Sequence, residues 1–305
     1  MQTKFTSIFT SIIRIAGHSI GGAVCAGAIL LIASSIQAQN LFEADYGSGN
    51  VHEFTPGGTQ STFAPGMNLP FGLAFGSTGD LYVSATGSGI IYKFTPGGVA
   101  STFASGLINP AGLAVDNAGN LYEADYGSGN IYKFTPGGVQ TTFASGLSYP
   151  DALAINSAGN LFEADYGSGN IFEFTPGGVQ TTFASGLSGP NGVAFNSAGN
   201  LFELDLYSGN INEFTPGGAE NTFASGLTTA TALAFDSADN LFVANNANGS
   251  IYEFTPGGVQ STFATGLDPF GVAVQPAPEP SSLGMLAAGA AALLISRLRR
   301  QAACR

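Results

Sequence analysis

The sequence of 305 residues contains no tryptophan and only two cysteines, Cys25 and Cys304. Both cysteines lie near the ends of the chain, so the long middle region has neither a disulfide nor thiolate chemistry. Histidine is equally scarce, because His18 and His52 are the only two. We expect His52 on the surface of a strand, and a site built from several histidines is excluded in the middle region.

Positive charge is almost absent from the middle region. Between residues 39 and 275 the only cations are Lys93 and Lys133, whereas every Asp and Glu of the chain except Glu279 lies there. Such a surface repels phosphate, so we expect no nucleic-acid partner, and cations or neutral polar molecules remain as ligand classes. The 44 glycines, 15 prolines and 24 phenylalanines predict many short strands joined by turns, that is, an all-β fold.

Residues 1–38 have the pattern of a secretory signal peptide. Lys4 and Arg14 precede an apolar stretch, and Ala38 is a small residue at which cleavage is expected. Residues 17–21 read Gly-His-Ser-Ile-Gly and match the G-x-S-x-G nucleophile elbow of α/β-hydrolases. That motif needs a strand-to-helix turn with a His and an acid nearby, so within a signal peptide we interpret it as coincidence.

The C-terminal segment, residues 276–305, has three parts in order. A Pro-Glu-Pro triplet is followed by an apolar run over residues 281–296, long enough for a short transmembrane helix, and then by arginines. This segment resembles the PEP-CTERM sorting signal of Gram-negative bacteria. The resemblance implies an exosortase as partner, removal of the tail, and release to the cell envelope or extracellular matrix; a permanent anchor is the alternative. The residues that carry it are Pro278, Glu279, Pro280, Arg297, Arg299 and Arg300.

The middle region, residues 39–275, consists of six repeats of forty residues, which start at positions 40, 80, 120, 160, 200 and 240. Each repeat contains four short alternating or apolar runs, in the third repeat at 121–125, 131–134, 139–144 and 152–155. Four strands in about forty residues are typical of a propeller blade. The Thr-Pro-Gly-Gly segment of each repeat (55–58 in the first) predicts a type II turn with positive φ at its first glycine.

The phase of the repeats predicts how the ring closes. If the innermost strand of each blade is called a and its neighbours b, c and d, the chain opens with a b strand at 41–45 and ends with an a strand at 270–274. We therefore expect a six-bladed β-propeller of four-stranded blades, in which the last a strand joins the first b, c and d strands and leaves no open edge.

The repeats resemble NHL repeats, whose pattern P-x-G-L-A-V-D…G-N-L-Y-V-A-D is close to residues 110–116 and 119–125. The resemblance covers residues 40–275 and implies the propeller fold. It implies little about activity, because one fold carries many different sites.

Candidate ligand-binding residues follow from the antiparallel blade, which places the d–a and b–c connections on one face. One position of the d–a connection differs from repeat to repeat, and its polar and apolar members fall on opposite halves of the ring. A channel mouth of this kind predicts a small amphipathic ligand such as a sugar, although free drift of loop residues is the alternative. The six residues are Phe71, Ala111, Asp151, Asn191, Thr231 and Phe270.

The b–c connections carry the repeated sequence Glu-Ala-Asp-Tyr-Gly-Ser-Gly-Asn. If Glu43 pairs with Glu53 across the hairpin, like charges face each other, and Ca²⁺ would relieve the repulsion. Alternatively the register differs and Asp45 hydrogen-bonds its own loop, which the missing D-x-[DN]-x-[DN]-G spacing favours. The metal hypothesis rests on Glu43, Asp45, Asp125, Glu163, Asp165 and Asp205.

Three functions remain open at this level. The first is an exported, non-enzymatic module that binds a carbohydrate or protein and needs no cofactor. The second is a metal-dependent hydrolase similar to the gluconolactonase group, in which Asp151 and Asn191 supply two of the metal-site residues; no glutamate stands on an a strand, which speaks against it. The third is a purely structural surface protein. Membrane contact is expected only through the tail.

Overall fold

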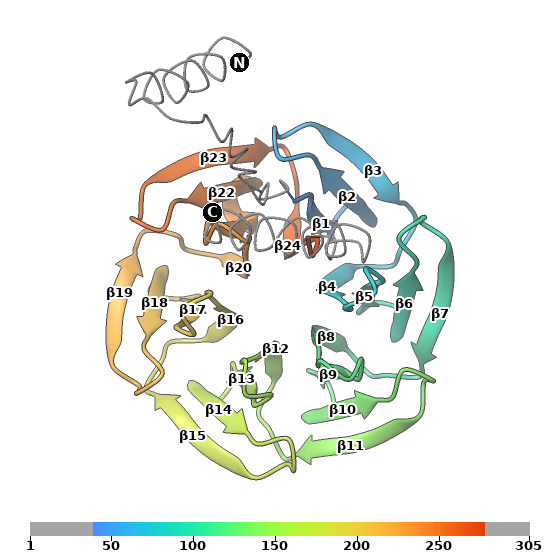
Figure 1. Cartoon of the computed structure of the whole chain (residues 1–305), viewed down its shortest axis with the longest axis horizontal. Helices are drawn as coiled ribbons and strands as arrows, with labels where there is room; N and C mark the ends of the chain where they lie inside the picture. The colour runs from blue at the N-terminus through green and yellow to red at the C-terminus, as the bar shows by residue number, and fades with distance from the viewer. Residues whose placement is uncertain (1–38, 278–305) are drawn as a thin grey trace, which may run out of the picture. The chain divides into compact units, whose positions relative to one another are not determined.

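The computed structural model describes residues 39–277, and these form the propeller that the repeats predict. Six four-stranded antiparallel sheets stand around a central axis (Figure 1). The predicted signal peptide (1–38), the sorting residues from Pro278 onward and the predicted tail helix lie outside the described residues. Within residues 39–277, no helix is long and apolar enough to cross a membrane.

The strands of each blade run from the axis outward in the order a, b, c, d. The a strands are β4 (Pro70–Phe75), β8 (Pro110–Val115), β12 (Pro150–Ile155), β16 (Pro190–Phe195), β20 (Ala230–Phe235) and β24 (Pro269–Val274). The b strands are β1 (Leu41–Asp45), β5 (Leu81–Ala85), β9 (Leu121–Asp125), β13 (Leu161–Asp165), β17 (Leu201–Asp205) and β21 (Leu241–Asn245). The c strands are β2 (Asn50–Phe54), β6 (Ile90–Phe94), β10 (Asn130–Phe134), β14 (Asn170–Phe174), β18 (Asn210–Phe214) and β22 (Ser250–Phe254). The d strands are β3 (Gln60–Ala64), β7 (Ala100–Ser105), β11 (Gln140–Ser145), β15 (Gln180–Ser185), β19 (Glu220–Ala224) and β23 (Gln260–Thr265). The 3₁₀ turn η1 (Asn246–Asn248) lies between β21 and β22.

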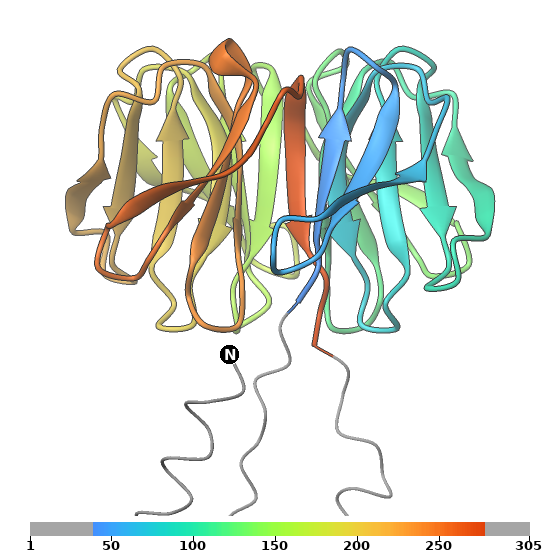
Figure 2. The same ribbon diagram turned by 90° about the horizontal axis from the view of Figure 1, so that it is seen from above.

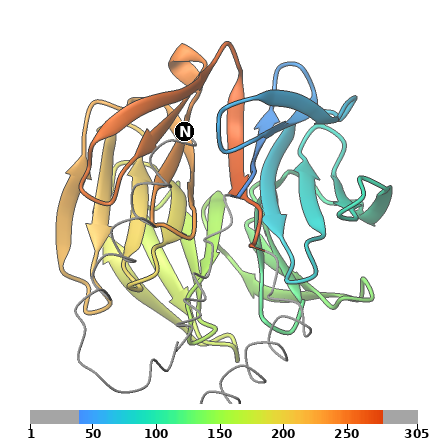
Figure 3. The same cartoon turned by 45° about the horizontal axis from the view of Figure 1, so that its top comes forward.

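The ring closes as predicted, because β24 pairs with β1 in the sheet β24-β1-β2-β3. Figures 2 and 3 show these two strands side by side although they come from opposite ends of the propeller sequence. Leu41 pairs with Val274 at one end of the ladder. No blade is therefore left with an open inner edge.

The core lies between neighbouring blades. Buried leucine, isoleucine and valine side chains alternate with T-shaped phenylalanine pairs, for example Phe42 with Phe63 at 5.0 Å and with Phe75 at 5.1 Å. The b strands are buried along their whole length, whereas the d strands expose their first residues to solvent. Because six such clusters recur around the ring, the blades stabilise one another.

The Thr-Pro-Gly-Gly turns differ from the prediction. The amide of Gly58 donates to the carbonyl of Thr55 at 2.8 Å, so the turn exists, but the positive φ (79°) falls on Gly58 and not on Gly57. A type II turn would need it at Gly57. The geometry matches a type I turn followed by a left-handed residue, which is common in short hairpin loops.

Candidate functional site

The d–a and b–c connections share one face of the propeller, as predicted. Backbone hydrogen bonds join them: the amide of Tyr46 donates to the carbonyl of Asp268, and the amide of Tyr126 to the carbonyl of Asn109. In Figure 2 this face is at the top, with η1 projecting from it, while residues 39–40 and 275–277 are at the bottom. The top face therefore carries the variable residues and the bottom face the uniform turns.

A cavity of about 380 Å³ opens on the top face around the propeller axis. Its volume falls within the roughly 300–1,000 Å³ of ordinary small-molecule sites. The structure brings all six predicted ligand-binding positions together here, but each is the second residue of an a strand and not, as predicted, a residue of the d–a loop. The cavity is lined by Tyr46, Phe71, Thr86, Asn109, Ala111, Tyr126, Asp151, Tyr166, Asn191, Leu206, Thr229, Thr231, Asn246 and Phe270.

Below this cavity the axis narrows to a channel of about 70 Å³ between the a strands. The cause is the close approach of neighbouring a strands: a Cβ added to Gly112 would lie 2.4 Å from the carbonyl oxygen of Asp151, and one added to Gly271 would lie 1.9 Å from that of Phe71. Real Cβ atoms do not come so close to backbone oxygens. The channel forms a floor beneath the cavity.

One half of the cavity wall is aromatic. The rings of Tyr46 and Phe270 lie 4.4 Å apart with an interplanar angle of 33°, and Phe71 follows at 5.5 Å from Phe270. Tyr46 and Phe270 belong to the closing blade β24-β1-β2-β3, and Phe71 belongs to the next blade. They give the cavity an apolar surface on which a flat apolar face of a ligand can pack.

On the opposite side the a-strand residues are polar, with Tyr126 and Tyr166 beside them, and they differ in how much hydrogen-bonding capacity they keep. The Asn191 amide donates to the carbonyl of Ala230 at 3.0 Å, and the Thr231 hydroxyl to that of Pro269 at 3.0 Å. Both therefore tie neighbouring a strands together. Asp151 is only 8% exposed, and its Oδ1 is buried without a partner among residues 39–277. Burial raises the pKa of this carboxyl from 3.8 to about 7.

A row of tyrosines that the sequence did not single out extends from the polar half. Tyr149 stacks on Tyr126 at 5.0 Å, Tyr166 follows at 6.3 Å from Tyr126, and Tyr207 at 6.0 Å from Tyr166. The Tyr166 and Tyr207 hydroxyls are hydrogen-bonded, and this contact, followed by burial, raises the pKa of Tyr166 to about 12. Tyr126 and Tyr166 line the cavity, while Tyr149 and Tyr207 are exposed beside it.

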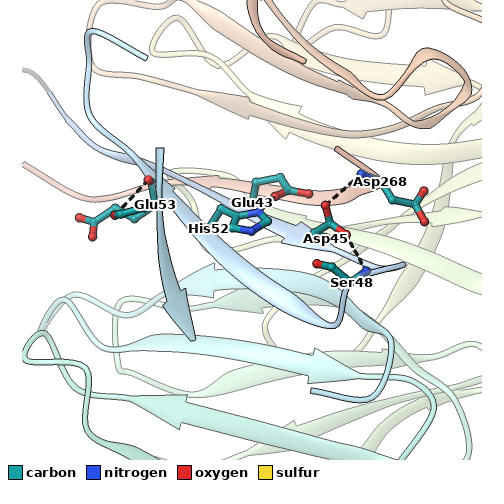
Figure 4. Close-up of polar contacts among 7 residues, drawn as sticks. Glu43, Asp45, Ser48, His52, Glu53 and Asp268 are labelled. Carbon is teal, nitrogen blue, oxygen red and sulfur yellow. Dashed lines mark hydrogen bonds and ion pairs between the residues drawn. The ribbon is translucent and has the colours of Figure 1, made fainter. Parts of the chain in front are cut away.

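The aspartates predicted as metal ligands hold loops in place. The Asp45 carboxylate accepts the amides of Ser48 at 2.8 Å and Asp268 at 3.0 Å (Figure 4). Burial opposes the charge of Asp45, but these bonds outweigh it and lower its pKa. The bond to its own loop was the alternative prediction, and it is confirmed. Asp125, Asp165 and Asp205 make the same two bonds, with one amide in their own loop and one in the preceding d–a connection.

The glutamates of the same motif are fully buried between blades, and the register is the alternative one of the two considered. Glu43 pairs with His52 and not with Glu53, since the loop brings Asp45 opposite Asn50. The expected like-charge pairs are absent from blades that carry this glutamate. Burial, followed by repulsion from Asp45 and Asp268, raises the pKa of Glu43 to about 9, and burial is also the main cause that raises the pKa of Glu163.

His52 is not a surface residue, contrary to the prediction. It is 7% exposed and its Nδ1 lies 2.9 Å from Oε2 of Glu43 (Figure 4). With Asp45 these residues form the only group of three acidic, His or Cys side chains within residues 39–277 whose ligand atoms lie within 4.8 Å of one another. The corresponding positions in the blades of Glu163 and Glu203 hold Phe172 and Asn212.

We expect the melting temperature of the protein to be the same in excess Ca²⁺ and in EDTA, because the four aspartates already accept backbone amides. A bound ion at a hundred times its dissociation constant would add about 2.7 kcal/mol, roughly 5–11 °C for a domain of this size. A rise of that size would instead establish a cation site. The His52→Asn variant, which copies the Glu203–Asn212 pair, would then show whether the Glu43 group is responsible.

Comparisons with known proteins support both the predicted sorting signal and the propeller fold. Residues 276–300 match the PEP-CTERM protein-sorting motif. The chain is a six-bladed β-propeller with a PEP-CTERM sorting motif. The motif implies export, with a C-terminal tail that anchors in the membrane. No curated protein sequence matches the chain significantly.

Solved structures share the propeller fold at low sequence identity. A chain of the nidogen/laminin complex aligns with a TM-score of 0.72 at 19% identity and covers 78% of this chain and 98% of its own. The virginiamycin B lyase of Staphylococcus aureus aligns at 0.62 and 14% identity, covering 78% and 89%. A protein proposed to be a gluconolactonase aligns at 0.60 and 17%, covering 68% and 81%. The fold prediction is thus confirmed, while the NHL repeat itself stays a prediction.

Proposed function

We propose that this protein is an exported, non-enzymatic binding module whose top cavity holds a carbohydrate. The observation that carries the proposal is that all six variable d–a residues line one cavity with an aromatic half and a polar half. Sugars present apolar faces of C–H groups together with hydroxyls, and such a cavity is complementary to both. The uniform bottom face offers no comparable variation.

The sorting motif supports the proposed place of action. Export follows from the motif. The finer statement, that an exosortase removes the tail and leaves the propeller in the cell envelope or extracellular matrix, belongs to the proposal. A binding module there would hold glycans or other matrix components.

The composition of the cavity argues against catalysis. Its only ionisable lining residues are Asp151 and the tyrosines Tyr46, Tyr126 and Tyr166. Acid–base hydrolysis of glycosides uses two carboxylates, and a second one is missing from this lining. The staphylococcal lyase becomes inactive when one histidine is replaced by alanine; His52, the histidine of residues 39–277, is buried in β2 and does not line the cavity.

A hydrolase similar to the gluconolactonases is the second candidate, because Asp151 and Asn191 share the cavity. Lactone hydrolysis by the purified protein that depends on Ca²⁺ would establish it in place of the binding role.

The binding role is tested by titrating the purified protein with a panel of oligosaccharides in a calorimeter. For a glycan that binds, we expect Phe270→Ala and Tyr46→Ala to weaken binding at least about tenfold, which corresponds to about 1.4 kcal/mol. The matched control is Val139→Ala, at an exposed turn of the bottom face, and it should leave the affinity unchanged. If no glycan binds, or if the aromatic variants bind as the parent does, the cavity is not a carbohydrate site.

A further inference from the structure

Asp151 is the one carboxyl group among the residues that line the top cavity. Its counterparts in the other blades are uncharged: Phe71, Ala111, Asn191, Thr231 and Phe270. The closure of six blades therefore does not require a carboxyl at this position. Asn191 and Thr231 bond neighbouring strands, whereas Oδ1 of Asp151 is buried without a hydrogen-bond partner among residues 39–277.

Within residues 39–277, no ion pair involves Asp151. The two lysines of the described residues are engaged elsewhere, since Lys93 pairs with Asp80 at 3.0 Å and Lys133 lies 3.9 Å from Asp116. Both of these aspartates stand at a–b turns on the bottom face. The negative charge of Asp151 contributes to raising the pKa of Glu163, Tyr126 and Tyr166, and none of these three groups is a cation.

A buried carboxyl without a partner is costly, and a ligand that brings a hydrogen-bond donor or a positive charge removes that cost. The cavity adds a second feature that favours positive charge. Tyr126 and Tyr166 line it on one side and Tyr46 and Phe270 on the other, and aromatic rings attract cations through the negative charge of their faces. The formal net charge of −12 attracts cations to the protein as a whole.

We infer that the ligand of the top cavity is an amino sugar whose protonated amine pairs with Asp151 between the aromatic rings. The inference rests on the proposed function and names the class of carbohydrate. Only an unacetylated amine fits, because acetylation removes the positive charge and enlarges the group. The lining also contains the polar side chains of Asn109, Thr229 and Asn246, and we expect the ring hydroxyls to face these groups.

The test compares two oligosaccharides of equal length, a tetramer of glucosamine and its fully N-acetylated counterpart, by calorimetry with the purified full-length chain. We expect the glucosamine tetramer to bind at least about tenfold more tightly, in line with the strength of a desolvated cation–π and carboxylate contact. Asp151→Asn, which keeps the shape of the side chain, should abolish this difference. Asp151→Thr should abolish the difference as well. It places at this position the residue that another blade carries there, Thr231, so the fold accommodates it.

Glu253→Gln is the matched control, because it removes one negative charge at a residue that does not line the cavity. It should keep the preference for glucosamine. Equal affinity for both tetramers, unchanged by Asp151→Asn, would overturn the amine inference and leave the carbohydrate site standing. If neither tetramer nor any neutral glycan binds, the proposed function fails as well. Tighter binding of a lysine tetrapeptide than of the glucosamine tetramer would overturn the assignment to a sugar.

Discussion

A chain that ends at Asp268, and so lacks β24, is expected to lose the cooperative melting transition that a chain ending at Ala277 retains. Without β24 the whole inner edge of β1 is unpaired, and β1 is buried along its five residues. β24 also packs between β20 and β4, so its loss opens the ring on both sides. Each large apolar side chain buried there contributes roughly 1.5–3 kcal/mol, against a total stability of about 5–15 kcal/mol.

The measurement is a thermal melt followed by circular dichroism, with size-exclusion chromatography to detect aggregation through the exposed edge. The chain ending at Ala277 is the matched control, since it removes the sorting motif and keeps every strand. If the chain ending at Asp268 melts cooperatively within a few degrees of the control, the ring does not depend on this closure.

The architecture was predictable because a forty-residue period with four strand-like runs is compatible with few folds, and the phase of the repeat placed β24 beside β1. The turn type was not predictable from the same residues. Gly57 and Gly58 both tolerate positive φ, so only the structure shows which of them adopts it. The hairpin register stayed open between two alternatives for a similar reason: a shift of one residue moves the partner of Glu43 from Glu53 to His52.

The candidate site was half predictable. When the six repeats are aligned, one position varies within an otherwise uniform pattern. This variation identified Asp151 and Phe270 from the sequence. Tyr46, Tyr126 and Tyr166 escaped notice since they recur in the same motif as the turn residues. His52 was misjudged because its environment depends on the cross-strand neighbour, and that follows from register.

Replacement of Glu123 by valine is expected to stabilise the protein, and the chain contains its own precedent. Glu123 stands in a row with Leu113 and Tyr132, whereas two other blades carry Leu-Val-Tyr in the same register. The equivalent valines, Val83 and Val243, are as fully buried as Glu123. Neither oxygen of Glu123 has a hydrogen-bond partner within residues 39–277. The precedent rows are Leu73-Val83-Tyr92 and Leu233-Val243-Tyr252.

The gain in folding stability of the Glu123→Val variant should depend on pH. Burial, followed by repulsion from Asp125, raises the pKa of Glu123 well above 4.5. Above about pH 4.5 the unfolded chain releases this proton while the folded chain keeps it, so the folded parent loses stability as pH rises toward the folded pKa. Valine has no proton to release. The difference between Glu123→Val and the parent therefore grows from acid to alkaline pH.

Urea unfolding at about pH 5 and about pH 8.5 measures this difference. We expect a gain of about 1–3 kcal/mol from removing an unpaired buried polar group, and a larger one at the higher pH. Val243→Glu should show the opposite change with the same dependence on pH, whereas Glu203→Val should gain less because it leaves Asn212 without its partner. A Glu123→Val variant that is less stable at both pH values would mean that Glu123 stabilises the folded state and that the blades tolerate valine only where it already occurs.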